Sequence, residues 1–343
     1  MFNLEVTCME YRILGKTDLN VSMMGLGGIP IQRIDAAGTR VLVEALAANG
    51  INYIDTARGY SVSEEYLGHA LDGLRDKFVI ATKSMARTKD SMAKDIDISL
   101  HNLKTQYIDL YQVHNPTLAQ LEQVVAEGGA LEALQDAKKA GKVRHIGLTA
   151  HSVEVFEKAL SLDWVETIMF PYNIVETQGE ELIKQCAEKN IGFIVMKPLA
   201  GGAIEDPTLA MRFISANPDV SVIIPGMAEV AELTQNLAAV NDTTPLCCSE
   251  LEKINSIRKE LGTQFCRRCG YCAPCSVGIS ISNMFLFEGY LKRYGLADWA
   301  RGRYETMAKT ASDCIGCGLC EERCPYNLPI RQMLKRTAKA FGK

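Results

Sequence analysis

Eight of the twelve cysteines fall in two short runs near the end of the chain. The first run, residues 266–275, reads CRRCGYCAPC, and the second, residues 314–325, reads CIGCGLCEERCP. The second has the spacing C-x2-C-x2-C-x3-C-P, in which three thiolates hold one four-iron cube and the fourth reaches another cluster. The first run is tighter, and Ser276 stands where a proline is more usual. Together the two runs predict two 4Fe-4S clusters.

The bacterial ferredoxin rule divides these thiols into two sets of four. Zinc is the alternative, because C-x2-C pairs also build tetrahedral structural sites. Two zinc sites need only paired cysteines, whereas each run spaces three or more thiols by two residues, which suits the corners of a cube and favours iron–sulfur. The predicted ligand sets are Cys266, Cys269, Cys272 and Cys324 for one cluster, and Cys314, Cys317, Cys320 and Cys275 for the other.

The remaining cysteines are expected to be ordinary buried or surface thiols. The first ten residues contain acidic side chains and no basic start followed by an apolar stretch, so they do not resemble a signal peptide. We therefore expect a cytoplasmic protein, in which close thiols hold metal more often than they form disulfides. The four thiols outside the two runs are Cys8, Cys186, Cys247 and Cys248.

Four titratable residues stand at the ends of three consecutive predicted strands. Asp55 ends the second predicted strand and Tyr60 follows it, while Lys83 and His114 close the third and the fourth. Each alone is more typical of a structural role, such as a helix cap, a solvated surface charge or a packed core histidine. Because the carboxyl ends of parallel strands meet at one face, the four together indicate a single pocket.

Such a set suits hydride transfer to a carbonyl, in which the oxygen receives a proton as the carbon receives hydride. Tyr60 can supply that proton, because a neighbouring ammonium lowers a phenol pKa from its reference value of about 10. Lys83 is predicted to provide the ammonium, and Asp55 to pair with it and orient it. His114 is predicted to hydrogen-bond the carbonyl oxygen and to fix which face meets the nicotinamide.

Short apolar runs alternate with longer stretches of helical period between about residues 21 and 240. Eight such units predict an α/β fold, a closed (β/α)8 TIM barrel, with helices that include 38–50, 91–104 and 179–190. A doubly wound sheet is the alternative on count alone, but it usually has a G-x-G-x-x-G after its first strand, which this chain lacks. The predicted strands are 23–28, 51–57, 78–83, 108–114, 143–150, 167–173, 192–198 and 220–226.

The end of the chain is predicted to be a mainly helical, ferredoxin-like iron–sulfur domain. Residues 282–308 mix aromatic and basic positions at helical spacing, and residues 328–343 also indicate a helix. Their lysines and arginines are expected on a solvated face, and a docking surface for an acidic electron-transfer partner is the alternative. The predicted domains are residues 1–245 for the barrel and residues 246–343 for the dicluster domain.

Several stretches resemble the aldo-keto reductase family along the whole barrel, in order and in spacing: MEYRILGKTDLNVSMMGLGG, NYIDTARGYSVSEEYLG, ATK, IDLYQVHNP and RHIGLT. The resemblance implies a tetrad that reduces aldehydes and ketones with a nicotinamide cofactor. With its cysteine-rich end, the chain resembles the branch of that family that carries a C-terminal ferredoxin-like domain. The expected substrate is a small carbonyl compound or alcohol, and the tetrad positions are filled by Asp55, Tyr60, Lys83 and His114.

The cofactor contacts of that family are kept less well than its tetrad. Thr149 matches a serine of the family, but Ala150 replaces an asparagine that would hold the carboxamide, and Met169 replaces a glutamine. Where the family stacks an aromatic ring on the nicotinamide, Met196 offers a thioether, which covers a ring without stacking on it. The resemblance therefore implies an altered nicotinamide pocket that includes Thr149 and Met196.

The segment after the last strand bears on the choice between NAD(H) and NADP(H). Family members that prefer NADPH have I-P-K-S followed by an arginine, whereas this chain has IPGMAEVAELTQN. Aligned on Pro225 and Asn236, Gly226 stands at the lysine and Glu232 at the arginine. An arginine fork matches a 2′-phosphate, whereas a carboxylate repels it and accepts hydrogen bonds from a ribose diol, so NAD(H) is favoured. A surface glutamate without cofactor contact is the alternative.

Two further features are candidates for contact with cofactor phosphates. Gly201 and Gly202 permit a close approach of the backbone, and the helix that follows IPG offers N-terminal amides. Ordinary turn glycines are the alternative.

Composition excludes two classes of partner. A net charge of −4, from 37 basic and 41 acidic residues, gives no basic footprint for nucleic acid. The sequence has no run of about eighteen uncharged apolar residues that could span a bilayer. We therefore expect a partner among small molecules rather than nucleic acid or membrane.

Three functions remain open. The barrel is an oxidoreductase with structural clusters, or the clusters conduct electrons between its substrate and an external carrier, or the barrel has lost turnover and is a binding or redox-sensing module. A hydride carries two electrons and each cube passes one, so coupling them calls for a flavin or another two-electron splitter, and no flavin fingerprint is visible. The intact tetrad argues against the third function.

Overall fold

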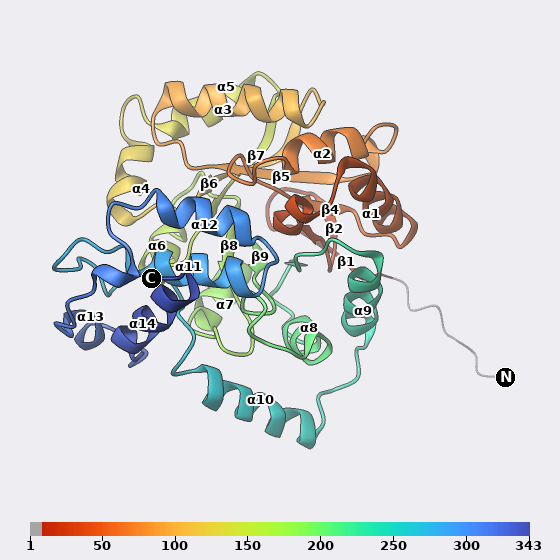
Figure 1. Cartoon of the computed structure of the whole chain (residues 1–343). Helices are drawn as coiled ribbons and strands as arrows, with labels where there is room; N and C mark the ends of the chain where they lie inside the picture. The colour runs from red at the N-terminus through yellow and green to blue at the C-terminus, as the bar shows by residue number, and fades with distance from the viewer. Residues whose placement is uncertain (1–8) are drawn as a thin grey trace. The chain divides into compact units, whose positions relative to one another are not determined.

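Eight parallel strands form one sheet in which each strand pairs with the next along the chain, and Figure 1 shows strands of this sheet among the surrounding helices. In the computed structural model, which describes residues 9–343, parallel bridges from Met24 to Ile223 and from Gly27 to Gly226 join the two edges and close the sheet. The predicted TIM barrel is confirmed. Its strands are β3 (Leu26–Gly27), β4 (Tyr53–Asp55), β5 (Val79–Ser84), β6 (Ile108–His114), β7 (Val143–Thr149), β8 (Thr167–Pro171), β9 (Gly192–Met196) and β10 (Val222–Ile224).

Helices connect these strands and surround the sheet (Figure 1). Side-chain caps start several of them: the Asp35 carboxylate accepts the amide of Gly38 at 2.7 Å, and Thr88 and Ser91 form a capping box. The helices are α1 (Ala36–Ala48), α2 (Ser63–Ala70), α3 (Lys89–Asn102), α4 (Leu118–Val125), α5 (Ala130–Lys139), α6 (Val153–Ala159), α7 (Glu180–Glu188), α8 (Pro207–Ser215) and α9 (Val230–Asn241), with short 3-10 helices at Ile29–Arg33 and Arg75–Lys77.

A hairpin before the first barrel strand, β1 (Tyr11–Ile13) and β2 (Asn20–Ser22), contributes to the barrel interior. Leu14 and Val21 belong to the same buried cluster as side chains from six strands of the barrel. The hairpin lies at the amino ends of the strands, since the Lys16 amide donates to the Asn190 carbonyl just before β9. Its packing leaves the opposite, carboxyl end of the barrel for the functional side chains. The interior cluster comprises Leu14, Val21, Tyr53, Ala81, Leu110, Met169, Ile194, Val222 and Ile224.

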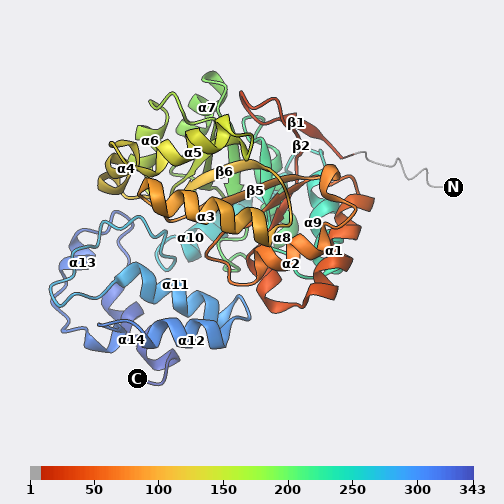
Figure 2. The same ribbon diagram turned by 90° about the horizontal axis from the view of Figure 1, so that it is seen from above.

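The C-terminal helices build a second, smaller core. In it α11 (Ile281–Lys292) packs against both α12 (Ala297–Glu305) and α14 (Ile330–Ala340), as Figure 2 shows. The rings of Tyr304 and Phe341 stack in this core with their centroids 4.0 Å apart. The other C-terminal helices are α10 (Cys248–Leu261), α13 (Leu319–Glu322) and a 3-10 helix at Ala311–Asp313.

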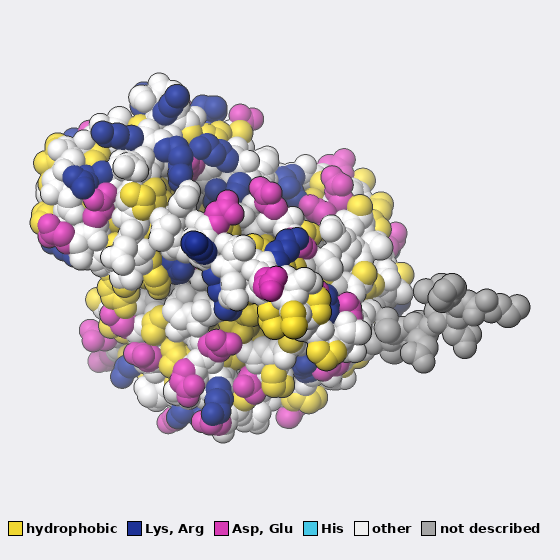
Figure 3. All heavy atoms as spheres, turned by 90° about the horizontal axis from the view of Figure 1, so that it is seen from below, with side chains coloured by type: hydrophobic (Ala, Val, Ile, Leu, Met, Phe, Trp, Pro, Cys, Tyr) yellow, Lys and Arg dark blue, Asp and Glu magenta, His cyan; other side chains and the backbone are white. Residues whose placement is uncertain are grey.

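The chain divides into two compact units. The first extends to Pro198 and resumes from Asp206 to Leu246, and the second comprises Leu199–Glu205 and Cys247–Lys343. Within residues 9–343 no helix is long and apolar enough to cross a membrane. On the face drawn in Figure 3, basic and acidic side chains are interspersed.

The cysteines outside the two runs differ in their surroundings. Cys186 is buried, and burial raises the pKa of its thiol to about 12. Cys247 and Cys248 are exposed at the start of α10, and Cys8 lies outside the described residues.

Candidate functional site

A buried ion pair links the ends of two neighbouring strands. Asp55 is the last residue of β4, and Lys83 lies near the end of β5. The Lys83 ammonium donates to Asp55 Oδ1 and, at 2.9 Å, to the carbonyl of Thr56. The two residues are only 2% and 1% exposed, so each charge depends on the other for compensation.

Burial shifts the pKa of each partner in the direction that favours its uncharged form. Burial raises the pKa of Asp55, although the charge and hydrogen bond of Lys83 oppose the shift, and it lowers the pKa of Lys83 against the opposing charge of Asp55. Gln112 on β6 also donates to Asp55 Oδ2, at 3.1 Å. Gln112 was not among the predicted site residues, although a polar residue two positions before His114 faces the same side of its strand.

Tyr60 and His114 complete the group at the carboxyl ends of the strands. Lys83 Nζ lies 4.8 Å from the centroid of the Tyr60 ring. The rings of Tyr60 and His114 meet edge to face, with centroids 6.3 Å apart and planes at 88°. Both side chains are half-buried, whereas the ion pair beneath them is enclosed. The structure thus brings the four predicted side chains together.

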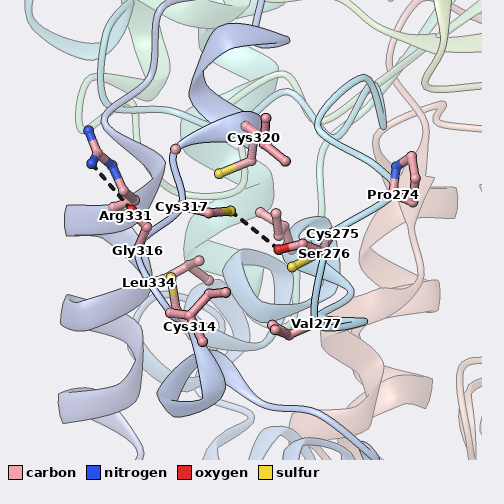
Figure 4. Close-up of a pocket in the computed structure, with 14 residues that line it drawn as sticks. Pro274, Cys275, Ser276, Val277, Cys314, Gly316, Cys317, Cys320, Arg331 and Leu334 are labelled. Carbon is pink, nitrogen blue, oxygen red and sulfur yellow. Dashed lines mark hydrogen bonds between the residues drawn. The ribbon is translucent and has the colours of Figure 1, made fainter.

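The cysteines of the two runs line two separate hollows in the C-terminal unit. The lining thiols of each hollow coincide with one of the sets that we predicted, although their role as metal ligands stays a prediction. The first hollow, drawn in Figure 4, is lined by Cys275, Cys314, Cys317 and Cys320, and the second by Cys266, Cys269, Cys272 and Cys324.

The donor set of each hollow fits a four-iron cluster. Within residues 9–343, no three His, Cys, Asp or Glu side chains converge closely enough to hold one metal ion. A cube spreads its thiolates more widely than a single ion does, because each sulfur binds a different iron. The loops also curl as such a site requires: Gly316 and Gly318 have φ of 75° and 85°, where other residues are strained.

The environments of the two hollows differ. Around the second, burial raises the pKa of the Cys266 thiol to about 12. In the first, Cys317 is exposed and lies 3.3 Å from the hydroxyl of Ser276 (Figure 4). That hydroxyl is the main cause of the lowered pKa of Cys317. The serine that replaces a usual proline is therefore in contact with a predicted ligand.

Comparison with known families agrees with both parts of the chain. Residues 23–208 match the model of the aldo/keto reductase family. The chain belongs to the aldo/keto reductase family. Residues 265–329 match the 4Fe-4S dicluster domain, so this aldo/keto reductase is an oxidoreductase with an iron–sulfur domain at its C-terminal end. The family implies a nicotinamide cofactor, and the dicluster domain implies 4Fe-4S clusters.

Individual relatives extend this result. L-galactose dehydrogenase of Arabidopsis thaliana is 28% identical over 296 residues, which cover 70% of this chain and 91% of the relative. NADH-specific methylglyoxal reductase of Escherichia coli is 29% identical over 222 residues, covering 56% of this chain and 68% of that protein. The holo form of an aldo-keto reductase from Bacillus halodurans superposes with a TM-score of 0.64 at 26% identity, over 73% of this chain and 96% of that one.

Two of the predicted nicotinamide contacts of this aldo/keto reductase, Thr149 and Met196, lie at the carboxyl ends of barrel strands. Thr149, at the end of β7, pairs in register with His114, and its hydroxyl accepts the Asn115 amide at 2.9 Å. Met196 ends β9 and is half-buried. Met169 and Ala150, at most 1% exposed, are enclosed in the barrel, so the polar groups that usually hold a carboxamide are replaced by buried apolar ones.

Glu232 takes part in two local interactions. Its Oε2 accepts the amides of Ala228 and Glu229, at 2.6 and 3.1 Å, at the start of α9. Its Oε1 lies 3.6 Å from the guanidinium of Arg33. The sequence pattern did not show this capping role, and the contact of Glu232 with a cofactor stays a prediction. Asn236 is buried in the same helix.

The glycines that we predicted to contact the cofactor have close protein neighbours. A Cβ on Gly226 would meet Pro30 Cγ at 2.8 Å, so the bare backbone is needed where the barrel closes. Gly201 and Gly202 have φ of 65° and 77° and lie against Tyr294 and Arg293, whose Nε donates to the Gly201 carbonyl at 2.9 Å. The structure thus shows protein neighbours at these glycines, and their contact with cofactor phosphates stays a prediction.

Proposed function

We propose that this protein interconverts a small carbonyl compound and its alcohol, with Tyr60 as the general acid and base. The observation that carries the proposal is the position of the buried Lys83 ammonium, 4.8 Å from the centroid of the Tyr60 ring and bonded to Asp55. A cation at this distance stabilises the phenolate, so that Tyr60 can give up a proton near neutral pH.

The other residues of the site have separate tasks. A nicotinamide, when bound, supplies the hydride for the carbonyl carbon. The Tyr60 hydroxyl donates its proton to the carbonyl oxygen, which becomes the alcohol, and the reverse reaction returns the proton to the phenolate. Asp55, held by Gln112, keeps Lys83 charged and in place. The His114 ring, edge-on to Tyr60, orients the carbonyl oxygen toward that hydroxyl.

Replacement of one hydroxyl tests this assignment. Tyr60→Phe removes the proton donor and keeps the ring, so kcat with NADH and a panel of small aldehydes that includes methylglyoxal should fall about 10²- to 10⁴-fold. Tyr66→Phe, on α2, is the matched control and should keep wild-type turnover. Near-normal turnover by Tyr60→Phe would exclude Tyr60 as the acid.

We further propose that NAD(H) is the preferred nicotinamide, with Thr149, Met196, Gly201, Gly226, Glu232 and Asn236 at its site. The support is the carboxylate of Glu232 where NADPH-binding relatives have arginine, together with an E. coli relative named as NADH-specific. Glu232→Gln keeps an oxygen for the amides of 228 and 229 but removes the charge, so it should improve NADPH binding and weaken NADH binding. A wild-type protein that binds NADPH more tightly in fluorescence titrations would refute this preference.

A second candidate function, electron transfer through two clusters, is favoured by the two four-thiol hollows. Iron and sulfide analysis after anaerobic purification should give eight of each per chain if both hollows hold a four-iron cluster. Replacement of Cys317 and Cys320 by Ala then separates the functions. A folded variant with unchanged NADH-dependent carbonyl reduction would exclude an obligatory electron path, whereas loss of that activity would support one.

A further inference from the structure

Three polar side chains form a chain of contacts beside the tetrad. Asn115, His151 and Lys197 follow β6, β7 and β9, at the end of the barrel where the tetrad lies. Lys197 Nζ is 2.6 Å from His151 Nε2, and His151 Nδ1 is 3.0 Å from Asn115 Oδ1. Because an ammonium only donates, His151 accepts at Nε2 and donates from Nδ1, which defines a neutral imidazole. The charge of Lys197 is thus met here by a neutral partner.

The backbone holds this lysine in a fixed place. Lys197 and Asn115 have φ of 56° and 46°, a region that costs free energy for residues other than glycine. The side-chain amide of Asn173 donates from Nδ2 to the Lys197 carbonyl at 2.9 Å and, at 2.8 Å, to the carboxylate of Glu176. These hydrogen bonds fix the turn after β9, so the backbone of Lys197 is held in place as well as its side chain.

A second cation at this end of the barrel also has neutral partners. Arg87, in the segment after β5, donates to the carbonyl of His114 at 2.8 Å and to that of Ala86 at 3.2 Å. Its Nε atom is buried and has no hydrogen-bond partner among the described residues. Lys83, by contrast, has Asp55. Among the residues that the structure describes, Lys197 and Arg87 hydrogen-bond only to neutral groups, and two such cations favour an anion at this end of the barrel.

We infer that Lys197, positioned by His151, binds an oxyanion on the substrate, so that the preferred carbonyl compounds carry a carboxylate or a phosphate. The inference rests on the proposed carbonyl chemistry and adds the substrate class. Lys197 binds the oxyanion, His151 orients the ammonium through Nε2, and Arg87 adds positive potential on the side of His114. The bound oxyanion supplies the negative charge that neither cation finds within residues 9–343.

Matched aldehydes test the substrate class. Succinic semialdehyde is compared with butanal, and glyceraldehyde 3-phosphate with glyceraldehyde, in the wild type and in Lys197→Met. A lost charge-assisted hydrogen bond should lower kcat/KM for the better charged member about 10- to 100-fold, mostly through KM, and change its neutral counterpart less than about twofold. The charged aldehyde whose kcat/KM falls in Lys197→Met also shows whether the site binds a carboxylate or a phosphate.

Two further variants make this result specific. Lys94→Met removes the same charge from an exposed position on α3 and should change nothing, whereas Lys197→Arg should restore the preference for the charged aldehyde. An equal fall for charged and neutral aldehydes in Lys197→Met, or a matching rise in the KM for the nicotinamide, would assign Lys197 to the cofactor or the chemistry and overturn the inference.

Direct binding separates this inference from the reductase proposal. Titration calorimetry of the nicotinamide-loaded protein with succinate and with inorganic phosphate should show binding of one of them by the wild type and by Lys94→Met, and its loss in Lys197→Met. Equal binding by all three proteins, or binding of neither anion by the wild type, would overturn the oxyanion site. A wild type that binds through Lys197 but reduces no aldehyde would refute the reductase and leave the site in place.

Discussion

In the barrel the predicted catalytic side chains lie outside the apolar cluster that fills the interior, whereas in the C-terminal unit two of the predicted cluster ligands are part of the buried core. The barrel interior is filled by residues such as Tyr53, Leu110 and Ile194, beneath the site. The buried cluster of the C-terminal unit includes Cys320 and Cys324 themselves. We therefore expect the first unit to fold without its ligands and the second to couple metal binding to folding.

The largest expected effect is the loss of the C-terminal fold when iron is removed. Without metal, burial holds the pKa of Cys266 at about 12 and that of Cys320 at about 11, so both thiols are neutral. The loops around each hollow are then no longer joined through thiolate–iron bonds. Anaerobic chelation should then open residues 247–343 to protease, as mapped by mass spectrometry, and leave the barrel resistant. Reconstitution with iron and sulfide is the control, and unchanged resistance after complete iron removal would show that this core is self-sufficient.

A smaller effect is expected from breaking the buried ion pair of the barrel. Asp55→Asn leaves Lys83 enclosed without its counter-charge and should lower the free energy of unfolding by about 3–5 kcal/mol. Urea unfolding measures this against Asp97→Asn, which removes an exposed pair with Lys142 and should cost less than about 1 kcal/mol. Equal losses in the two variants would mean that the site contributes nothing to the scaffold.

Acid should weaken the hydrogen bonds of Glu166, which lies at the end of the barrel opposite the tetrad. Burial raises the pKa of Glu166, but hydrogen bonds from His145, Lys138 and the Ile146 amide outweigh it and hold the pKa at about 2. Since the folded pKa lies below the ordinary value of 4.5, the stabilisation is present above that value and is lost as the pH falls toward 2.

Glu166→Gln should therefore cost about 2 kcal/mol at neutral pH, allowing for solvent screening, and less near pH 3. Urea midpoints followed through Trp164, in a Trp299→Phe background, report on the barrel. The exposed Glu44, paired with Arg40, provides the control Glu44→Gln. A cost that does not change with pH would show that Glu166 acts through packing rather than charge.

The smallest effect concerns the two hollows themselves. Ser276 lies against Cys317 in the first, and Ser282 hydrogen-bonds Cys272 in the second. Hydrogen bonds to ligand sulfur stabilise the reduced cluster, so Ser276→Ala and Ser282→Ala should each lower one reduction potential by on the order of tens of millivolts. Potentiometric titration followed by electron paramagnetic resonance should show a different cluster shifted in each variant. Equal shifts of both clusters would mean that the serines act on the unit as a whole.

The sequence was informative wherever spacing or strand ends carried the signal. The eight strands and the meeting of Asp55, Lys83 and His114 followed from apolar runs that end in polar residues. The grouping of the thiols followed from a known cluster pattern, because neighbouring cysteines are constrained by short loops.

Features that depend on register or on unusual backbone angles were not predictable in the same way. The β1–β2 hairpin has strands too short for a periodic signal, yet Leu14 and Val21 fill the barrel. The contact of His151 with Lys197 joins residues 46 apart through a left-handed turn. The capping role of Glu232 was hidden because a carboxylate near a helix start suits both a cap and a cofactor contact.

The small loop 199–205 has a consequence for how such a protein can be rearranged. It lies within the barrel sequence but belongs to the C-terminal unit, where Arg293 holds the carbonyl of Gly201. The chain therefore passes from one unit to the other at 198, 205 and 246 rather than once. A domain exchange that cuts the chain only at 246 would transfer an incomplete C-terminal unit. Recombination therefore has to transfer residues 199–205 together with residues 247–343.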